Sequence, residues 1–152
     1  MNVAKWLTKL IEKCTFCRVI DKPFVKYEVY YRWLPHKIHT LVIVESPPSG
    51  YKDDFLYNLD RKDRLRRNLK RILGLNFEAD SELLRWLKAR GIFITDTVKC
   101  RPSNKRLIKS MMLKCYPILR EEISILKPKR VIVLGRVAEE AIERIKLGKD
   151  VE

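Results

Sequence analysis

The chain has 152 residues, the size of a single domain whose continuous core needs no disulfide staples. Hydrophobic residues make up 46% of it, and no stretch reaches the roughly 18 apolar residues of a membrane span, so neither a disordered chain nor a membrane protein is expected. Lys and Arg outnumber Asp and Glu by 33 to 19, and the net charge of +14 predicts attraction to polyanions such as nucleic acid.

The first predicted element is an amphipathic helix within residues 1–13. Apolar residues recur there at helical spacing, and Lys5, Lys9 and Lys13 fall on the opposite side. The lysines interrupt the stretch too often for the core of a secretion signal, so we expect a cytoplasmic protein. In a reducing compartment the next cysteines, Cys14 and Cys17, are expected to be metal ligands rather than disulfide partners.

Three continuous apolar runs predict strands that are buried on both faces, namely Thr40–Val44, Ile92–Thr95 and Arg130–Leu134. Helices are predicted at 61–73, 82–90, 104–126 and 137–147, whereas Lys26–Trp33 is compatible with a strand or an ordered loop. This alternation predicts an α/β fold, a three-layer α/β/α domain with a short parallel sheet. We expect residues 1–152 to form one domain, with the segment 1–39 packed on an α/β core of residues 40–147.

The carboxyl ends of the predicted strands are the expected place for a ligand. These ends are the segments 45–50 and 96–102 and the residue Gly135. An uncovered edge of the three-stranded sheet also makes a protein partner or a homodimer through this edge worth testing.

The predicted helix at 61–73 has an apolar stripe of Leu65, Leu69, Ile72 and Leu73, and cations occupy much of the rest. One basic helix face is often only solvated surface, and a chain without Gln is typical of thermophile surfaces. A second basic cluster at 99–106 follows a predicted strand end, and two clusters favour phosphate contact. We therefore expect single- or double-stranded DNA as a partner, and charge alone does not exclude RNA. The residues predicted to bind nucleic acid are Arg61, Arg64, Arg66, Arg67, Lys70, Arg71, Lys99, Arg101, Lys105 and Arg106.

The chain has four cysteines, a Cys14-x2-Cys17 pair near the N-terminus and Cys100 and Cys115 in the second half. This arrangement predicts one metal site that is built from both ends of the fold. Structural zinc and iron–sulfur clusters both use four cysteines, so the spacing does not choose the metal. The alternative is four buried, reduced thiols that behave as small apolar groups.

Three segments at the strand ends carry a family resemblance: VIVESPP at Val42–Pro48, ITDTVKCRP at Ile94–Pro102, and CYPILREEISILKPK at Cys115–Lys129 with VIVLGRVA at Val131–Ala138. In this order they resemble motifs of the thermostable iron–sulfur uracil-DNA glycosylases, and the resemblance extends from Cys14 to about residue 145. It implies the fold of that superfamily without its last strand. It also implies a 4Fe–4S cluster on Cys14, Cys17, Cys100 and Cys115, with structural zinc as the alternative.

By the same resemblance, the protein would extrude a base from DNA, read its edge and break its bond to the sugar. Catalytic roles would fall to Glu45, which would orient water, and to Asp96. The base would contact Ser46, Pro47, Asp96, and Phe55 or Tyr57, although both aromatic rings are equally expected to pack against the sheet.

The chain departs from the family at two points. The family has Asn where this chain has Asp96, and an ionised carboxylate lacks the donor that O4 of uracil needs. Asp96 is therefore protonated in a dry pocket, or another base is preferred, or recognition is lost. In addition, the family's HPS-type motif, whose His stabilises the leaving uracil anion, would follow beyond Glu152.

Two functions follow from these residues. One is an iron–sulfur enzyme that excises uracil or another deaminated base from DNA in base-excision repair. The other is a catalytically inactive nucleic-acid-binding or accessory subunit of a repair or replication complex. Asp96 and the missing His motif favour the second function, and the Glu45 loop with its aromatic residues favours the first.

Overall fold

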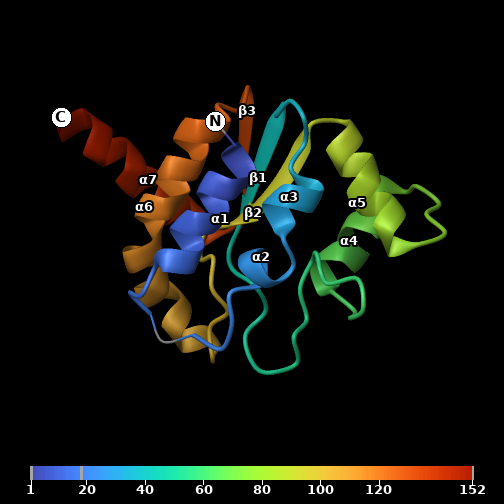
Figure 1. The fold of residues 1–152 in the computed structure, drawn as a ribbon, viewed down its shortest axis with the longest axis horizontal. Helices are drawn as coiled ribbons and strands as arrows, with labels where there is room; N and C mark the ends of the chain where they lie inside the picture. Colours follow the sequence, from blue (N-terminus) through green and yellow to red (C-terminus); the bar gives the residue numbers. More distant parts are fainter. Residues whose placement is uncertain (1, 18, 152) are drawn as a thin grey trace.

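The computed structural model describes residues 2–17 and 19–151 (Figure 1). Strands β1 (Thr40–Val44), β2 (Ile92–Asp96) and β3 (Arg130–Val133) form one parallel sheet in the order β2-β1-β3. Thr40 lies opposite Ile92 and Arg130 on its two neighbours, and Val44 lies opposite Asp96. The three predicted strands are thus confirmed to within one residue at each end.

Helices connect these strands and cover both faces of the sheet. The chain begins with α1 (Val3–Lys13), α2 (Pro23–Lys26) and α3 (Val29–Trp33); α4 (Arg64–Leu73) and α5 (Asp80–Ala89) follow β1; the short 3-10 helix η1 (Lys105–Leu107) and α6 (Ile108–Leu126) follow β2; and α7 (Arg136–Val151) follows β3. Figure 1 shows α6 and α7 on one side of the sheet and α4 and α5 on the other, which confirms the three-layer α/β/α architecture. None of the described helices combines the length and the apolarity that a membrane crossing requires.

The segment Lys26–Trp33 corrects the prediction of a strand or a loop, because it belongs to two short helices, α2 and α3. They are separated at Glu28, whose φ of 49° lies in the left-handed region. Val29, Tyr30 and Trp33 are buried at helical spacing. Over so few residues an alternating pattern and a helical pattern coincide, and the many aromatic residues suggested a strand.

Aromatic rings from distant parts of the sequence form one side of the core. Phe24 of α2 lies 5.6 Å from both Tyr30 of α3 and Phe55, measured between ring centroids. Tyr30 in turn lies 5.6 Å from Phe93 of β2. The N-terminal segment therefore packs directly on the sheet, next to the loop that follows β1.

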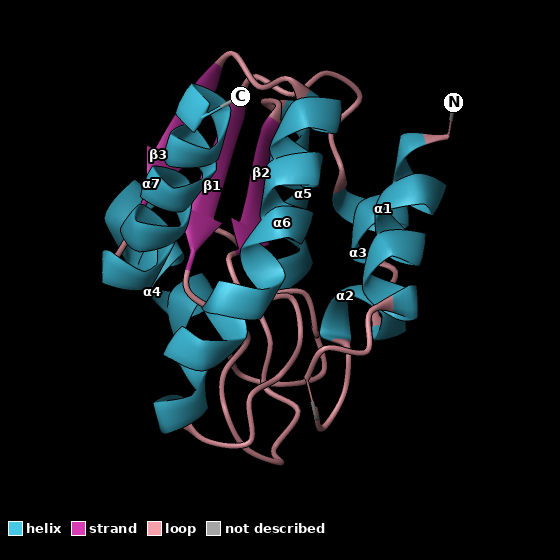
Figure 2. Ribbon diagram, turned by 90° about the vertical axis from the view of Figure 1, so that its left-hand side faces the viewer, coloured by secondary structure: helices cyan, strands magenta, loops and turns pink. Residues whose placement is uncertain are grey.

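Strand β3 forms an outer edge of the sheet (Figure 2). Its Val131 is 39% exposed, and Leu134, just after the strand, is 48% exposed. A partner that pairs with this edge stays a prediction.

Candidate active site

A pocket of about 280 Å³ opens where β1 and β2 end. The carboxyl ends of neighbouring parallel strands converge there, and the pairing continues into the loops, since the N–H of Thr97 donates to the carbonyl of Val44 and that of Val98 to the carbonyl of Glu45. The lining residues are Ser46, Pro47, Pro48, Phe55, Leu56, Tyr57, Asp63, Arg64, Leu65, Asn68, Ile94 and Asp96. The pocket thus brings together the five residues that the sequence nominated for base contact, whereas Glu45 is exposed beside it.

Asp96 supplies a buried carboxyl group to the pocket wall. The residue is 6% exposed. The pKa of Asp96 is raised to about 8, chiefly by burial; the charges of Lys99 and Arg101 oppose the rise, and those of Asp63 and Glu122 contribute to it. The carboxyl group is therefore mainly protonated at neutral pH, with both a donor and an acceptor available to a ligand.

The aromatic side of the pocket is anchored in the core. Phe55 and Tyr57 lie 5.6 Å apart in an edge-to-face arrangement. Tyr57 also stacks on Phe93 and donates from its hydroxyl to the carbonyl of Ile94 at 2.5 Å. The two rings pack against the sheet and border the pocket at the same time, so the two roles weighed from the sequence are compatible.

Helix α4 forms a wall that the sequence did not predict. Asp63 caps this helix by accepting from the N–H of Arg66 at 2.8 Å, and Arg64, Leu65 and Asn68 follow on the side that faces the pocket. Burial raises the pKa of Asp63, and the N–H and charge of Arg66 work against that rise. The helix predicted at 61–73 in fact begins at Arg64, and Asp63 is its N-cap. An Asp at a helix start is an N-cap signal, which is the sequence feature that could have found Asp63.

The four cysteines line a second, smaller cavity between α1 and α6. Cys100 and Cys115 are buried, and Cys14 and Cys17 are partly exposed. Burial raises the pKa of Cys100 to about 12 and that of Cys115 to about 11, so without a cation these thiols are neutral. A metal centre would reverse this preference, because coordination deprotonates a thiol.

The four thiols are a donor set that both a zinc ion and a 4Fe–4S cluster use. Among the described residues, no three His, Cys, Asp or Glu side chains are close enough to hold one metal ion. A zinc ion would need sulfurs about 3.8 Å apart, given Zn–S bonds of about 2.3 Å. The space between the thiols is about 10 Å³, but a cavity of about 370 Å³ adjoins it and shares Cys14, Phe16 and Ile118.

A buried ion pair lies between the pocket and the cysteine cavity. The ammonium group of Lys99 is 2.6 Å from Glu122 of α6 and also donates to Thr95 and to the main-chain carbonyl of Asp96. The backbone N–H of Lys99 donates to the sulfur of Cys115 at 3.5 Å. Lys99 thus contacts both the end of β2, which carries Asp96, and helix α6, which carries Cys115 and Glu122.

The predicted phosphate contacts need correction at three positions. Arg66 and Arg101 are 1% exposed and Lys99 is fully buried, and each donates to groups inside the protein. These three side chains therefore do not reach a phosphate backbone. The half-buried Lys70 pairs with Asp80 at 2.8 Å, and the exposed members of the predicted set are Arg61, Arg64, Arg67, Arg71, Lys105 and Arg106.

The sheet topology and the pocket define an α/β protein with a ligand site at the carboxyl ends of β1 and β2. The model of the uracil DNA glycosylase superfamily matches residues 33–151, and the chain belongs to that superfamily.

Curated relatives agree with this assignment over shorter segments. The chain is 40% identical to a Type-4 uracil-DNA glycosylase of Pyrobaculum aerophilum over 62 residues, which cover 40% of this chain and 31% of the relative. It is 38% identical to a Type-4 uracil-DNA glycosylase of Sulfurisphaera tokodaii over 73 residues, 47% of this chain and 28% of the relative. A Type-5 uracil-DNA glycosylase of Pyrobaculum aerophilum is 34% identical over 59 residues, 39% and 26% of the two chains. The matches thus span less than a third of each relative, and no solved structure matches the chain significantly.

Proposed function

We propose that this protein binds DNA and excises uracil, or another deaminated base that presents the same donor and acceptor, from a flipped-out nucleotide. The observation that carries the proposal is the carboxyl group of Asp96, which is buried, mainly neutral and bordered by the pocket. A protonated carboxyl accepts through its carbonyl oxygen and donates through its hydroxyl, as an amide does. It therefore matches N3–H and O4 of uracil, and equally N1–H and O6 of hypoxanthine.

The remaining pocket residues support the same reaction. Phe55 and Tyr57 offer an apolar wall for the face or edge of the base. Arg64 is the cationic side chain among the lining residues and would stabilise the negative charge on the departing base. Glu45, exposed just after β1, would orient the attacking water.

The DNA strand would run across the exposed cations. Arg64 lies at the pocket, and Arg67 and Arg71 continue along the same helix at spacings that keep them on one side. Lys105 and Arg106 form the second exposed group, next to the loop that bears Cys100. Contacts from these groups would position a strand without reading its sequence.

We also propose that Cys14, Cys17, Cys100 and Cys115 hold a 4Fe–4S cluster, which would act as a structural clamp between the two ends of the chain. Support comes from the four thiols, which line one cavity although they come from both ends of the chain. Protein purified without oxygen should be brown and contain about four iron atoms and four sulfides per chain. Colourless protein with one zinc ion would contradict the cluster.

The activity is tested with oligonucleotides that contain uracil, hypoxanthine or xanthine in single or double strands. We expect abasic product from the wild-type protein and none from Asp96→Ala. Arg136→Gln, an exposed change at the start of α7, is the matched control and should leave the rate unchanged. Tight binding without any product would contradict the enzyme and favour the inactive DNA-binding subunit.

A further inference from the structure

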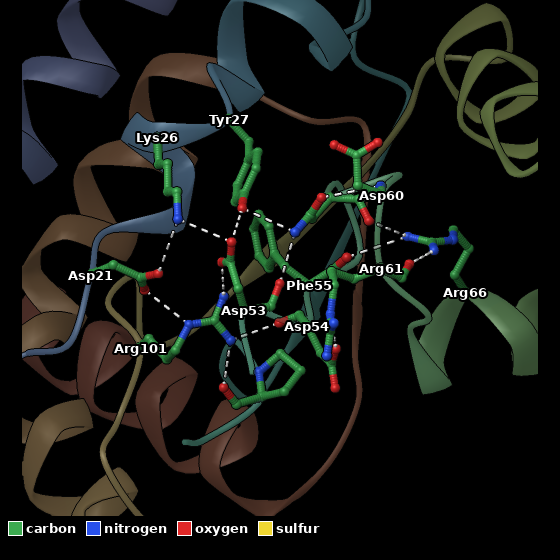
Figure 3. A network of polar contacts seen from close by, with 12 residues as sticks. Asp21, Lys26, Tyr27, Asp53, Asp54, Phe55, Asp60, Arg61, Arg66 and Arg101 are labelled. Atoms are coloured by element: carbon green, nitrogen blue, oxygen red, sulfur yellow. Dashed lines mark hydrogen bonds and ion pairs between the residues drawn. The ribbon is translucent and has the colours of Figure 1, made fainter. Parts of the chain in front are cut away.

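Buried Arg101 contacts three short segments of the chain, at Asp21, at Pro48 and at Asp53–Asp54 (Figure 3). Its Nε donates to the carboxylate of Asp21 at 2.9 Å, and its backbone N–H donates to the carbonyl of the same residue. Its Nη1 donates to the carbonyls of Pro48 at 2.8 Å and Asp54 at 2.6 Å, and Nη2 donates to the carboxylate of Asp53 at 3.2 Å. A buried guanidinium with this many charge-assisted contacts fixes its partners in one arrangement.

Two of these segments belong to the loop that carries pocket residues. Pro48 lines the pocket, and Phe55 follows Asp54 directly. Asp53 has a left-handed backbone with a φ of 60°, which is unfavourable for a non-glycine residue. Its carboxylate is also held by Lys26 at 3.0 Å and by the hydroxyl of Tyr27. The loop between β1 and Phe55 thus depends on side chains from elsewhere for its shape.

The third segment belongs to the cysteine cavity. Arg101 directly follows Cys100, and Asp21 is four residues beyond Cys17. The next residue, Lys22, donates from its ammonium group to the carbonyls of Ile11, Glu12 and Cys14 at 2.7–2.9 Å. The contact between Asp21 and Arg101 therefore joins the two halves of the cysteine site.

We propose that Arg101 is a positioning residue that couples occupancy of the four-cysteine cavity to the shape of the pocket loop. A metal centre that fixes Cys14 and Cys17 against Cys100 would hold Asp21 on Arg101, and Arg101 would then hold Pro48, Asp53 and Asp54. Only the effect of this coupling on base excision rests on the proposed function. The coupling itself is a property of the loop and is measurable without substrate.

Trypsin cleavage after Lys52 reports the state of this loop. Lys52 is exposed and precedes Asp53, so the peptide bond is cut when the loop leaves Arg101. In metal-loaded protein, Arg101→Gln should raise the cleavage rate at Lys52 by about tenfold or more, since several charge-assisted hydrogen bonds are lost. Arg101→Lys should give a smaller rise because it keeps the charge but not the fork of donors. Arg136→Gln is the control, and thermal unfolding shows whether each variant is folded.

The decisive comparison removes the metal with a chelator. Removal should accelerate cleavage after Lys52 in the wild-type protein and add little in Arg101→Gln, because the connection is already broken there. If Arg101→Gln does not fold, Asp53→Asn removes one contact of the guanidinium and should show the same pattern more weakly. Cleavage that is unaffected by metal removal, or protein that binds neither iron nor zinc, would overturn the coupling. A wild-type protein that shows the coupling but excises no base would instead overturn the proposed function alone.

Discussion

Asp96 illustrates how a carboxylic acid can take the place of an amide. The residue ends β2, so its side chain points away from Thr95, which contacts Glu122 of α6 on the opposite face of the sheet. The pocket that it lines also contains the apolar residues Leu56 and Leu65 and a second acid, Asp63. An apolar wall and a neighbouring negative charge both disfavour ionisation. The change from the family's Asn therefore preserves a donor and an acceptor as long as the proton stays bound.

This proton should limit activity at alkaline pH. Because the pKa of Asp96 is raised to about 8, excision of uracil should fall as the pH rises through that value, since the ionised form has lost its donor. Asp96→Asn should keep activity and remove this alkaline decline. Rates under single-turnover conditions between pH 6 and about 9.5 test the prediction. An inactive Asp96→Asn variant would instead indicate that the ionised carboxylate is the catalytic form.

The same proton should make stability depend on pH. The folded-state pKa of Asp96 lies above the value of 3.8 for a free carboxyl. Stability from this group is therefore fully present below about pH 4, and it is lost as the pH rises to about 8, because the unfolded state releases the proton and the folded state retains it. Each pH unit in that window costs about 1.4 kcal/mol at most. Asp96→Asn should therefore be more stable than wild type at pH 7 and similar to it at pH 4. Urea unfolding at both values measures the difference, and equal effects at the two values would contradict the shift.

Buried cations are the residues that the sequence misidentified. Runs of Lys and Arg predict a basic surface, yet Arg66, Lys99 and Arg101 lie inside. Their partners are main-chain carbonyls and acids far along the chain, such as Glu122 for Lys99 and Asp21 for Arg101. A count of charges in a short window contains no information about such distant partners, whereas the pocket residues at strand ends followed directly from the predicted sheet.

The Lys99–Glu122 pair yields a prediction for stability. Both side chains are fully buried, so Glu122→Gln leaves an ammonium group without its counter-charge and should lower the free energy of unfolding by about 3–5 kcal/mol. Adding Lys99→Met removes the buried charge and should restore most of that loss. A double-mutant cycle tests this prediction: urea unfolding is measured for the wild type, both single variants and the double variant. A double variant less stable than Glu122→Gln would contradict this account.

At the scale of elements, β-strands were predictable and short helices were not. Each strand is a continuous apolar run that ends at a turn, so its position followed from local sequence. The helices α2 and α3 are four and five residues long, too short for a helical period to emerge. The wall that α4 gives to the pocket was also missed, because its approach to β2 depends on the path of a long loop.

Helix α4 has an unexpected burial pattern. Its predicted apolar stripe is only partly buried, and Ile72 within it is 78% exposed, whereas Arg66 is the buried residue of the helix. The guanidinium of Arg66 donates to the carbonyls of Leu56 and Asn58 and pairs with Asp80 at 2.9 Å. The helix is therefore held to the pocket loop by polar contacts more than by apolar packing.

This pattern predicts opposite outcomes for two substitutions in α4. Arg66→Met should lower the free energy of unfolding by about 2–4 kcal/mol, since several buried carbonyls lose their donor. Ile72→Gln should change it by less than about 0.5 kcal/mol, as expected for an exposed site. Thermal and urea unfolding of the two variants test the contrast. A larger loss of unfolding free energy for Ile72→Gln than for Arg66→Met would indicate that the apolar stripe is the buried face of α4.

For the whole molecule, the attraction that the surplus of positive charge exerts on DNA has to be distinguished from the contacts of particular residues. A net charge of +14 attracts any polyanion, and only residues at the pocket side should contribute directional contacts to DNA. Arg64, Arg67 and Arg71 are exposed on α4, and Lys5, Lys9 and Lys13 are exposed on α1. Reversal of either triple to Glu changes the net charge by the same amount. A comparison of the two variants therefore distinguishes a DNA interface on α4 from a general attraction by net charge.

Reversal of the α4 triple should weaken binding to DNA of every sequence and flatten its salt dependence. Each lost phosphate contact lowers the slope of log affinity against log salt by about 0.9 for duplex DNA and about 0.7 for a single strand. The loss of three contacts should therefore reduce the slope by about 2 to 3. The α1 triple should reduce affinity less and leave the slope nearly unchanged, because Lys9 and Lys13 line the cavity beside Cys14 and none of the three lysines lines the pocket. Fluorescence anisotropy at several salt concentrations measures both quantities. Equal slopes for the two reversed triples would show that the interface does not lie on α4, even if the protein excises a base.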